Sequence, residues 1–252
     1  MRVALVTGGG RGIGRAIAHA LAGPDTCVVV AARTRSQLEA TVEDLARLGG
    51  RAVAIEMDVT DDASVAAGMR RLREAAGRLD ILVNNAGIGG GEPIGGSDVA
   101  RWRRTIETNL TGTYLVTRGA MELMRDNGRI VNISSVLGRF GVPGYTAYCA
   151  SKHGVIGFTR ALALELAPRQ ITVNALCPGW VDTEMAAEGM RQGAQATGKT
   201  FEQFREQALD AVPIQRIIQP EEVAALVCFL AAAPAAAITG QTYNICGGQT
   251  MD

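Results

Sequence analysis

The residues best placed for chemistry are a tyrosine and a lysine, Tyr148 and Lys152, four positions apart in a stretch with helical periodicity. Residues i and i+4 share one face of a helix, so the two side chains are expected to be neighbours. A lysine ammonium beside a phenol favours the phenolate and lowers a pKa that is otherwise about 10. The pair therefore predicts proton transfer to or from a bound molecule. An ordinary half-buried tyrosine beside a surface lysine is the alternative.

A second candidate site is the glycine-rich turn after the first predicted strand, Thr7-Gly8-Gly9-Gly10-Arg11-Gly12-Ile13-Gly14. Glycines permit a sharp turn and let the backbone approach a pyrophosphate, which the free N–H groups and positive dipole end of the next helix would hold. The spacing is G-x-x-x-G-x-G rather than the commoner G-x-G-x-x-G. We expect a dinucleotide-binding turn, and a purely structural turn is the alternative.

The residues after the second predicted strand, Ala31-Ala32-Arg33-Thr34-Arg35, indicate which dinucleotide would bind. Units that bind NAD tend to carry an acidic residue here for the ribose 2′-hydroxyl, whereas this chain has arginines. Guanidinium groups bind phosphate oxygens in pairs, so Arg33 and Thr34, with Arg11 in reach from the glycine turn, predict NADP(H). Solvated surface charge is the other interpretation of these arginines.

These positions need a scaffold, and the chain alternates short β-branched runs with longer stretches of helical periodicity. This alternation is typical of βαβ units, so we expect an α/β Rossmann fold with a doubly wound parallel sheet of about seven strands, in a single domain over residues 1–252. The expected strands are 3–7, 27–31, 52–57, 81–84, 130–134, 171–176 and 242–245, and the expected helices are 12–22, 35–48, 61–76, 98–126, 146–167 and 220–232.

The segment 183–211 interrupts the alternation. It is polar, rich in Gln, Glu and Met, and follows the carboxyl end of a predicted strand, where open α/β sheets bind ligands. We expect a mobile lid over the site, with a solvated surface helix pair as the alternative. Its residues Met185, Met190, Phe201 and Phe204 would face a substrate or pack within the lid.

Composition argues against several other classes of protein. Lys+Arg and Asp+Glu are both 25, so the chain lacks the basic excess of a nucleic-acid-binding protein. Five scattered cysteines and two histidines without ligand spacing predict neither a disulfide framework nor a metal site. No apolar run reaches about 18 residues, and the first residues enter a β-like run without a leader. We therefore expect a soluble, cytoplasmic protein with no membrane partner.

Further motifs extend the pattern, namely Asp58-Val59, Asn84-Asn85-Ala86-Gly87, Asn109, Ser135 and Pro178-Gly179. In order and spacing, these and the motifs above resemble the short-chain dehydrogenase/reductase family of the compact single-domain kind, over essentially the whole chain. The chain is most similar to 3-oxoacyl-carrier-protein reductases and aromatic polyketide ketoreductases, through Glu107-Thr108-Asn109-Leu110-Thr111-Gly112, Ser151-Lys152-His153-Gly154 and Asn244-Ile245-Cys246-Gly247-Gly248.

The resemblance implies a role for four catalytic residues. Tyr148 would protonate the carbonyl oxygen as hydride arrives from nicotinamide C4, and Ser135 would donate a hydrogen bond to that oxygen. Lys152 would hold the nicotinamide ribose and lower the pKa of the tyrosine. Asn109 would hold a water that resupplies the proton through the lysine.

The resemblance also implies binding residues. Besides Tyr148 and Lys152, those for the cofactor are Gly8, Gly10, Arg11, Gly12, Ile13, Gly14, Arg33, Thr34, Asp58, Val59, Asn85, Ala86, Gly87, Pro178, Gly179, Val181 and Thr183. Those for the substrate are Gly90, Gly91, Val142, Tyr145, Met185 and Met190. Gly89 stands where polyketide ketoreductases usually have a proline before the glycine pair.

We therefore expect an NADPH-dependent reductase acting on the ketone of a 3-oxoacyl thioester or a related cyclic or polyketide ketone, either coenzyme A- or carrier-linked. An NADP(H)-dependent alcohol or hydroxysteroid dehydrogenase and a non-catalytic NADP(H)-sensing interaction protein are the alternatives. The resemblance implies arginines near two positions at the mouth of the cleft in the carrier-protein reductases. Arg169 matches one of them, whereas Asp126 stands at the other and would repel an acidic carrier, which favours coenzyme A esters or free cyclic ketones. Relatives of this size usually form tetramers, so a homotetramer is expected.

Overall fold

The computed structural model describes residues 1–251 and contains a seven-stranded parallel sheet in the order β3-β2-β1-β4-β5-β6-β7. The strands are β1 (Arg2–Thr7), β2 (Thr26–Ala32), β3 (Arg51–Glu56), β4 (Leu79–Asn84), β5 (Met124–Ile133), β6 (Thr172–Pro178) and β7 (Thr242–Ile245). The order reverses between β1 and β4, which begin the two halves of a doubly wound sheet. The predicted fold class is confirmed.

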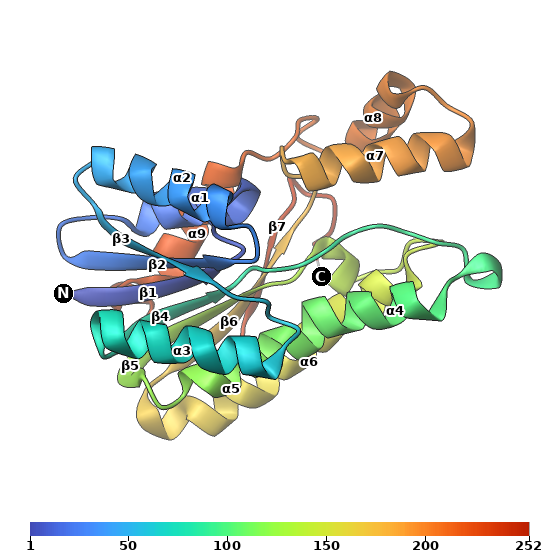
Figure 1. Ribbon diagram of the computed structural model, residues 1–252. Helices are drawn as coiled ribbons and strands as arrows, with labels where there is room; N and C mark the ends of the chain where they lie inside the picture. Colours follow the sequence, from blue (N-terminus) through green and yellow to red (C-terminus); the bar gives the residue numbers. More distant parts are fainter. Residues whose placement is uncertain (252) are drawn as a thin grey trace.

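Helices cover both faces of this sheet (Figure 1). One layer consists of α1 (Gly12–Leu21), α2 (Arg35–Arg47) and α9 (Pro220–Ala231), and the other of α3 (Asp62–Ala76), α5 (Gly112–Ala120) and α6 (Thr146–Leu166). Alternate strand residues enter opposite cores: Val3 and Leu5 pack with the second layer, and Ala4 and Val6 with the first. Both cores are apolar, so each face of the sheet packs against its helices. This packing fixes the positions of the strand ends relative to one another.

The helix predicted over 98–126 is interrupted in the structure. It consists of α4 (Val99–Ile106), a π-helical turn η2 (Glu107–Thr111) and α5, and β5 already begins at Met124. Leu123 and Met124 are buried in the core, so their apolar character continued the helical pattern beyond the end of the helix. Asn127, with a φ of 63°, then accompanies a register shift between β4 and β5.

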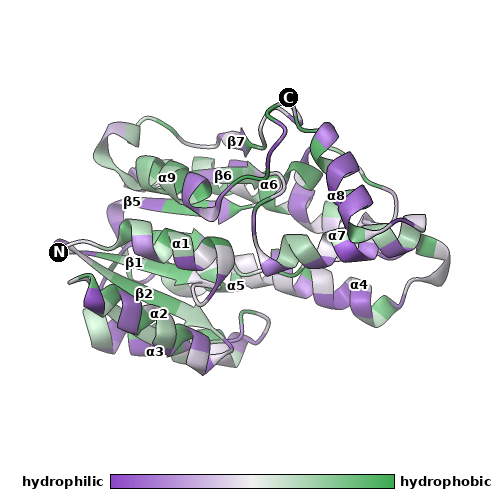
Figure 2. Ribbon diagram, turned by 90° about the horizontal axis from the view of Figure 1, so that it is seen from above, coloured by the Kyte–Doolittle hydropathy of each residue, from purple (hydrophilic) through white to green (hydrophobic). Residues whose placement is uncertain are grey.

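Beyond the carboxyl ends of the strands, α7 (Glu184–Thr197) and α8 (Phe201–Asp210) form an arm that projects from the sheet in Figure 1. Figure 2 shows many hydrophilic residues on this arm, in contrast to the hydrophobic strands. Each helix has a threonine N-cap: Thr183 accepts from Ala186 N–H and Thr200 from Gln203 N–H. The segment predicted to be a lid is thus two capped helices, and its motion stays a prediction.

Within residues 1–251, no helix combines the length and the apolar character needed to cross a bilayer.

Candidate active site

The glycine turn lies where the strand order reverses, and bonds between the ends of β1 and β4 hold it. Thr7 Oγ1 accepts from the backbone N–H groups of Asn85 and Ala86, both at 3.0 Å, and Asn85 Nδ2 donates to the Thr7 carbonyl at 2.9 Å. Gly8 has a φ of +66°, a conformation that favours glycine. The turn therefore keeps its shape through buried contacts on the β4 side.

Gly14 does not line the cavity, which corrects its predicted contact with the cofactor. A Cβ at this position would overlap the carbonyl oxygen of Gly8 and lie 2.5 Å from Asn85 Nδ2. Gly14 is needed because α1 begins directly against the turn.

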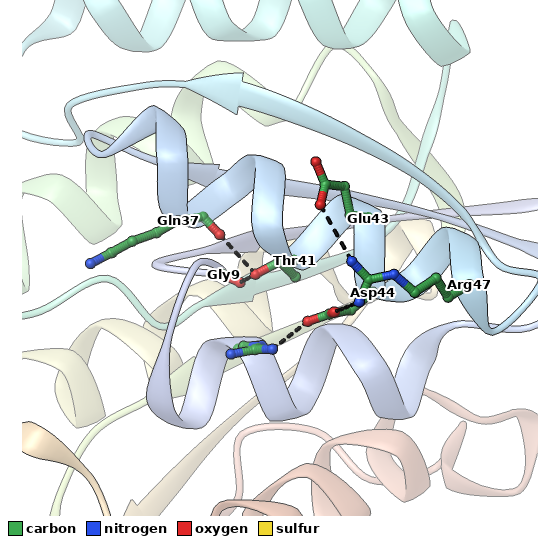
Figure 3. Close-up of polar contacts among 7 residues, drawn as sticks. Gly9, Gln37, Thr41, Glu43, Asp44 and Arg47 are labelled. Atoms are coloured by element: carbon green, nitrogen blue, oxygen red, sulfur yellow. Dashed lines mark hydrogen bonds and ion pairs between the residues drawn. The ribbon is translucent and has the colours of Figure 1, made fainter.

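Helix α2 holds the turn from its other side (Figure 3). Thr41 Oγ1 is within hydrogen-bond distance of the carbonyls of Gly9, at 3.3 Å, and Gln37, at 3.0 Å. Further along α2, Asp44 accepts from Arg47 at 2.9 Å and also pairs with Arg15 of α1. The first N–H groups of a helix have no partner within it, and those of α1 at Gly12 and Ile13 lie at the cavity. This arrangement suits a phosphate.

A cavity of about 690 Å³ runs from this turn to the arm. Of the predicted cofactor residues, those lining it are Gly8, Gly10, Arg11, Gly12, Ile13, Arg33, Thr34, Asp58, Val59, Asn85, Ala86, Gly87, Tyr148, Lys152, Pro178, Gly179, Val181 and Thr183. Apart from Tyr148 and Lys152 on α6, they lie at the start of α1 or at and after the ends of β1, β2, β3, β4 and β6. The residues therefore fit an extended dinucleotide.

The two arginines predicted to bind phosphate differ in their partners. Arg33 lies 3.8 Å from Asp58 and its side chain is 71% exposed, so it is weakly held. Arg11 donates to Glu184, in the first turn of α7, at 2.7 Å. Arg35 pairs with Glu39 on α2 and does not line the cavity. Arg33 is thus the guanidinium most available to a ligand in this cavity.

Tyr148 and Lys152 meet on one face of α6, as predicted, and Ser135 follows β5 beside them. Lys152 Nζ lies 5.6 Å from the centre of the Tyr148 ring and donates to the Ile133 carbonyl at 2.9 Å. Ser135 is hydrogen-bonded to Tyr148 and accepts from Leu137 N–H at 3.1 Å. All three of these residues, predicted to be catalytic, line the cavity. A phenol and a hydroxyl thus face the same space, where both can reach one substrate oxygen.

The expected lowering of the tyrosine pKa is wrong for this arrangement. Burial raises the pKa of Tyr148 to about 12, against the smaller lowering effect of the Ser135 hydrogen bond. Burial also lowers the pKa of Lys152 to about 8. The ammonium interacts with the Ile133 carbonyl rather than with the phenol oxygen. Tyr148 is therefore protonated at neutral pH, as a proton donor must be.

Asn109 lies in the π-helical turn and is buried behind the cavity wall. Its Nδ2 donates to the Ile88 carbonyl at 3.0 Å and to Ser151 Oγ at 3.1 Å, and its Oδ1 accepts from Ile88 N–H at 2.8 Å. It does not line the cavity. These bonds hold the segment after β4, and its predicted role with a water stays a prediction.

Two serines that sequence reasoning did not assign support α6 at the catalytic residues. Ser134 Oγ donates to the Lys152 carbonyl at 2.9 Å, and Ser151 Oγ donates to the Tyr148 carbonyl at 2.8 Å. Both serines are buried. Their adjacency to Ser135 and Lys152 was the available signal, because polar residues beside catalytic ones often position them.

The predicted substrate residues are only partly at the cavity. Gly90, Val142, Tyr145 and Met185 line it. Gly91 instead packs on the Tyr145 ring, where a Cβ would lie 2.8 Å from Cε2. Met190 is 1% exposed and does not line the cavity, so its predicted substrate contact is wrong.

Sequence reasoning missed much of the wall around these residues. The further lining residues near the arm are Leu137, Phe140, Pro143, Trp180, Ala186, Gly189, Gly193, Ala196 and Thr197, together with Phe204, for which lid packing had been an equal alternative. Outside the cavity, Arg169 donates to Asp126 at 2.9 Å, so its charge is paired. Within residues 1–251, no group of three or more His, Cys, Asp or Glu could hold a metal ion.

Comparisons with known proteins agree with this geometry. A family model described as enoyl-(acyl carrier protein) reductase matches residues 8–250. The ketoacyl reductase of the monensin polyketide synthase from Streptomyces virginiae is 45% identical over 98% of this chain and 96% of its own. A 3-oxoacyl-[acyl-carrier-protein] reductase from a Synechocystis strain is 42% identical over 99% of this chain and 97% of its own.

The comparison with solved structures gives the same result. A variant of the actinorhodin polyketide ketoreductase, solved with NADPH, has a TM-score of 0.94 and 42% identity, covering 98% of this chain and 97% of that one.

Proposed function

Because this chain belongs to the short-chain dehydrogenase/reductase family, we propose that it is an NADPH-dependent ketone reductase acting on 3-oxoacyl thioesters or related cyclic and polyketide ketones. The observation that carries the proposal is the position of the Tyr148 phenol, hydrogen-bonded to Ser135 and beside Lys152, in a cavity that continues to the glycine turn. NADPH, when bound there, supplies the hydride.

The chain's own residues supply the rest of the reaction. Ser135 and Tyr148 both donate to the ketone oxygen, so the negative charge that develops on it is stabilised in place. Tyr148 then gives its proton to that oxygen. Lys152, when charged, offsets the phenolate that remains, and the Ile133 carbonyl, Ser134 and Ser151 keep both side chains in position.

The choice of cofactor rests on Arg33. Its exposed guanidinium lies at the cavity beside Thr34, and its weak pairing with Asp58 leaves it free to bind a 2′-phosphate. The relative with the TM-score of 0.94 contains NADPH. We infer that this chain uses NADP(H) through the same end of the cavity.

The form of the substrate is inferred from the ion pair of Asp126 with Arg169, which lies outside the cavity at the start of β5. Asp126 offsets the charge of Arg169 in this pair. An acidic carrier protein would gain little there. We infer that coenzyme A thioesters and free cyclic ketones are used at least as well as carrier-bound acyl groups.

Assembly is a further part of the proposal. The side chains of Tyr114 on α5, Leu164 on α6 and Phe229 on α9 are 46%, 80% and 49% exposed. Exposed apolar residues on long helices suit contacts between copies of the chain, and a homotetramer would bury them. Light scattering giving a mass near 26.4 kDa, that of one chain, would contradict this.

The central experiment follows the loss of NADPH absorbance with 3-oxoacyl thioesters, 2-enoyl thioesters, cyclic ketones and hydroxysteroids, together with product analysis. We expect reduction of the first and third groups. Reaction with steroids alone would support the hydroxysteroid dehydrogenase alternative. Reaction with enoyl thioesters alone would support enoyl reduction, the activity named in the description of the family model. NADPH binding without turnover on any of them would support a sensor.

A further inference from the structure

The arm contributes a contact between its two helices that shapes the cavity. Phe204 of α8 rests against Gly193 of α7, where a Cβ would lie 2.6 Å from ring atom Cε2 and closer still to Cζ. Both residues line the cavity. The edge of the phenyl ring therefore occupies the space that any larger residue at position 193 would need.

One turn earlier on α7, a second glycine faces the catalytic end. A Cβ at Gly189 would lie 3.5 Å from the Trp180 ring and 4.0 Å from Tyr145 Oη. The Tyr145 ring is 6.5 Å from that of Tyr148. Gly189 and Gly193 are four residues apart, and four residues of an α-helix rise about 6 Å. The contact of Phe204 with Gly193 is therefore about 6 Å further along α7 than the point where Gly189 faces the catalytic end.

The wall between these two points suits an apolar ligand. Phe140 and Val142 contribute from the segment between Ser135 and α6, and Met185 and Ala196 contribute from α7. Hydrophobic and aromatic walls with polar groups at one end are typical of sites that bind the apolar body of a small molecule.

We propose that Phe204, seated on Gly193, forms the far wall of the substrate pocket and limits the length of the acyl chain that fits beyond the reacting ketone. This inference rests on the proposed ketone reductase function. The apolar tail of the substrate lies along the face of α7 that carries Gly189 and Gly193. The thioester end of the substrate points away from Phe204. Phe204 is thus a specificity residue, and Ser135, Tyr148 and Lys152 remain the catalytic ones.

The test measures kcat/KM with NADPH for 3-oxoacyl N-acetylcysteamine thioesters of four, eight and twelve carbons. Phe204→Ala should raise the ratio for the twelve-carbon against the four-carbon substrate by about tenfold, and Phe204→Trp should lower it. Phe201→Ala is the matched control, because Phe201 is also on α8 but does not line the cavity. Its ratio should equal that of the unaltered protein.

A steric pair separates this role from simple packing of the arm. Gly193→Ala should displace the ring of Phe204 and lower the ratio of kcat/KM for the twelve-carbon against the four-carbon substrate. Adding Phe204→Ala should restore this ratio to at least that of the unaltered protein, because the new methyl group then has no ring to meet. If Phe204 only stabilised the arm, both single variants and the double variant would lose activity on every chain length together. Thermal unfolding of each variant identifies any that fail to fold.

The outcomes distinguish this inference from the function on which it rests. If the unaltered protein reduces none of the thioesters, the proposed function fails and this inference falls with it. If it reduces them but Phe204→Ala and Phe204→Trp leave the chain-length ratio unchanged, the reductase stands and the far wall is elsewhere. Failure of the double variant to restore the ratio would also overturn the proposal.

Discussion

The two ends of the cavity are held by different kinds of interaction. At the glycine turn, buried and part-buried hydrogen bonds join the segments after β1 and β4 and helix α2: Thr7 accepts from Asn85, and Thr41 donates to Gly9. At the arm, α7 and α8 meet through side chains such as Phe204, and Met185 is 46% exposed. The turn is thus the more firmly held end, and we call it the rigid end. We propose that the cofactor depends on this end and the choice of substrate on the arm.

The largest effect is expected at the catalytic tyrosine, where the two ends meet. Tyr148→Phe should lower kcat by about 10³-fold, because the proton donor is lost while the ring still packs. The dissociation constant for NADPH, followed by its fluorescence, should change less than about threefold, within about 0.7 kcal/mol. Retention of a large fraction of the activity would assign proton donation to another group.

Cofactor preference tests the rigid end next. Arg33→Glu should shift the kcat/KM ratio toward NADH by about 10- to 100-fold, because a carboxylate repels the 2′-phosphate and accepts from a free hydroxyl. Arg35→Glu is the matched control, since Arg35 pairs with Glu39 outside the cavity. Equal shifts in the two variants would show that the effect comes from general surface charge rather than from a phosphate site.

Rigidity at this end can be measured directly. Gly14→Ala should lower the free energy of unfolding by about 1–3 kcal/mol, because its methyl group would overlap the Gly8 carbonyl. Gly23→Ala should change it by less than about 0.5 kcal/mol, because no atom lies within 4 Å of a Cβ there. A Gly14 variant as stable as the Gly23 variant would mean that the turn accommodates the added methyl group.

A pH dependence of stability is expected from Lys152. Burial lowers its pKa to about 8 from the ordinary 10.5, so between these values the unfolded chain binds more protons than the folded chain. The cost of burying the ammonium is fully present below pH 8 and is relieved as the pH rises toward 10.5. The unfolding free energy of the unaltered protein should therefore rise relative to that of Lys152→Met across this window. A constant difference in denaturant titrations would contradict the shift.

The success of prediction from the sequence differs between the same two ends. Short apolar runs such as Val3 to Val6, alternating with helical stretches, and the glycine turn predicted the sheet and its cofactor end, because their patterns are local. The arm was harder, since Met190 and Phe204 are both apolar residues in helices, and nothing local shows which side of α7 meets the cavity. The direction of the Tyr148 pKa shift was missed because burial by distant segments determines it.

The π-helical turn at Glu107–Thr111 sets the rotational phase of α5. Each added residue turns an α-helix by about 100°, so α5 presents a different side of the helix than it would if α4 continued unbroken. Asn109 faces Ile88 and Ser151 from this turn, while Val116 and Ala120 of α5 enter the core shared with α3. Deleting a single residue here would rotate the amide away from the catalytic helix or withdraw α5 from the sheet. Loop deletions of the same length would be absorbed, but this one changes the site and the core together.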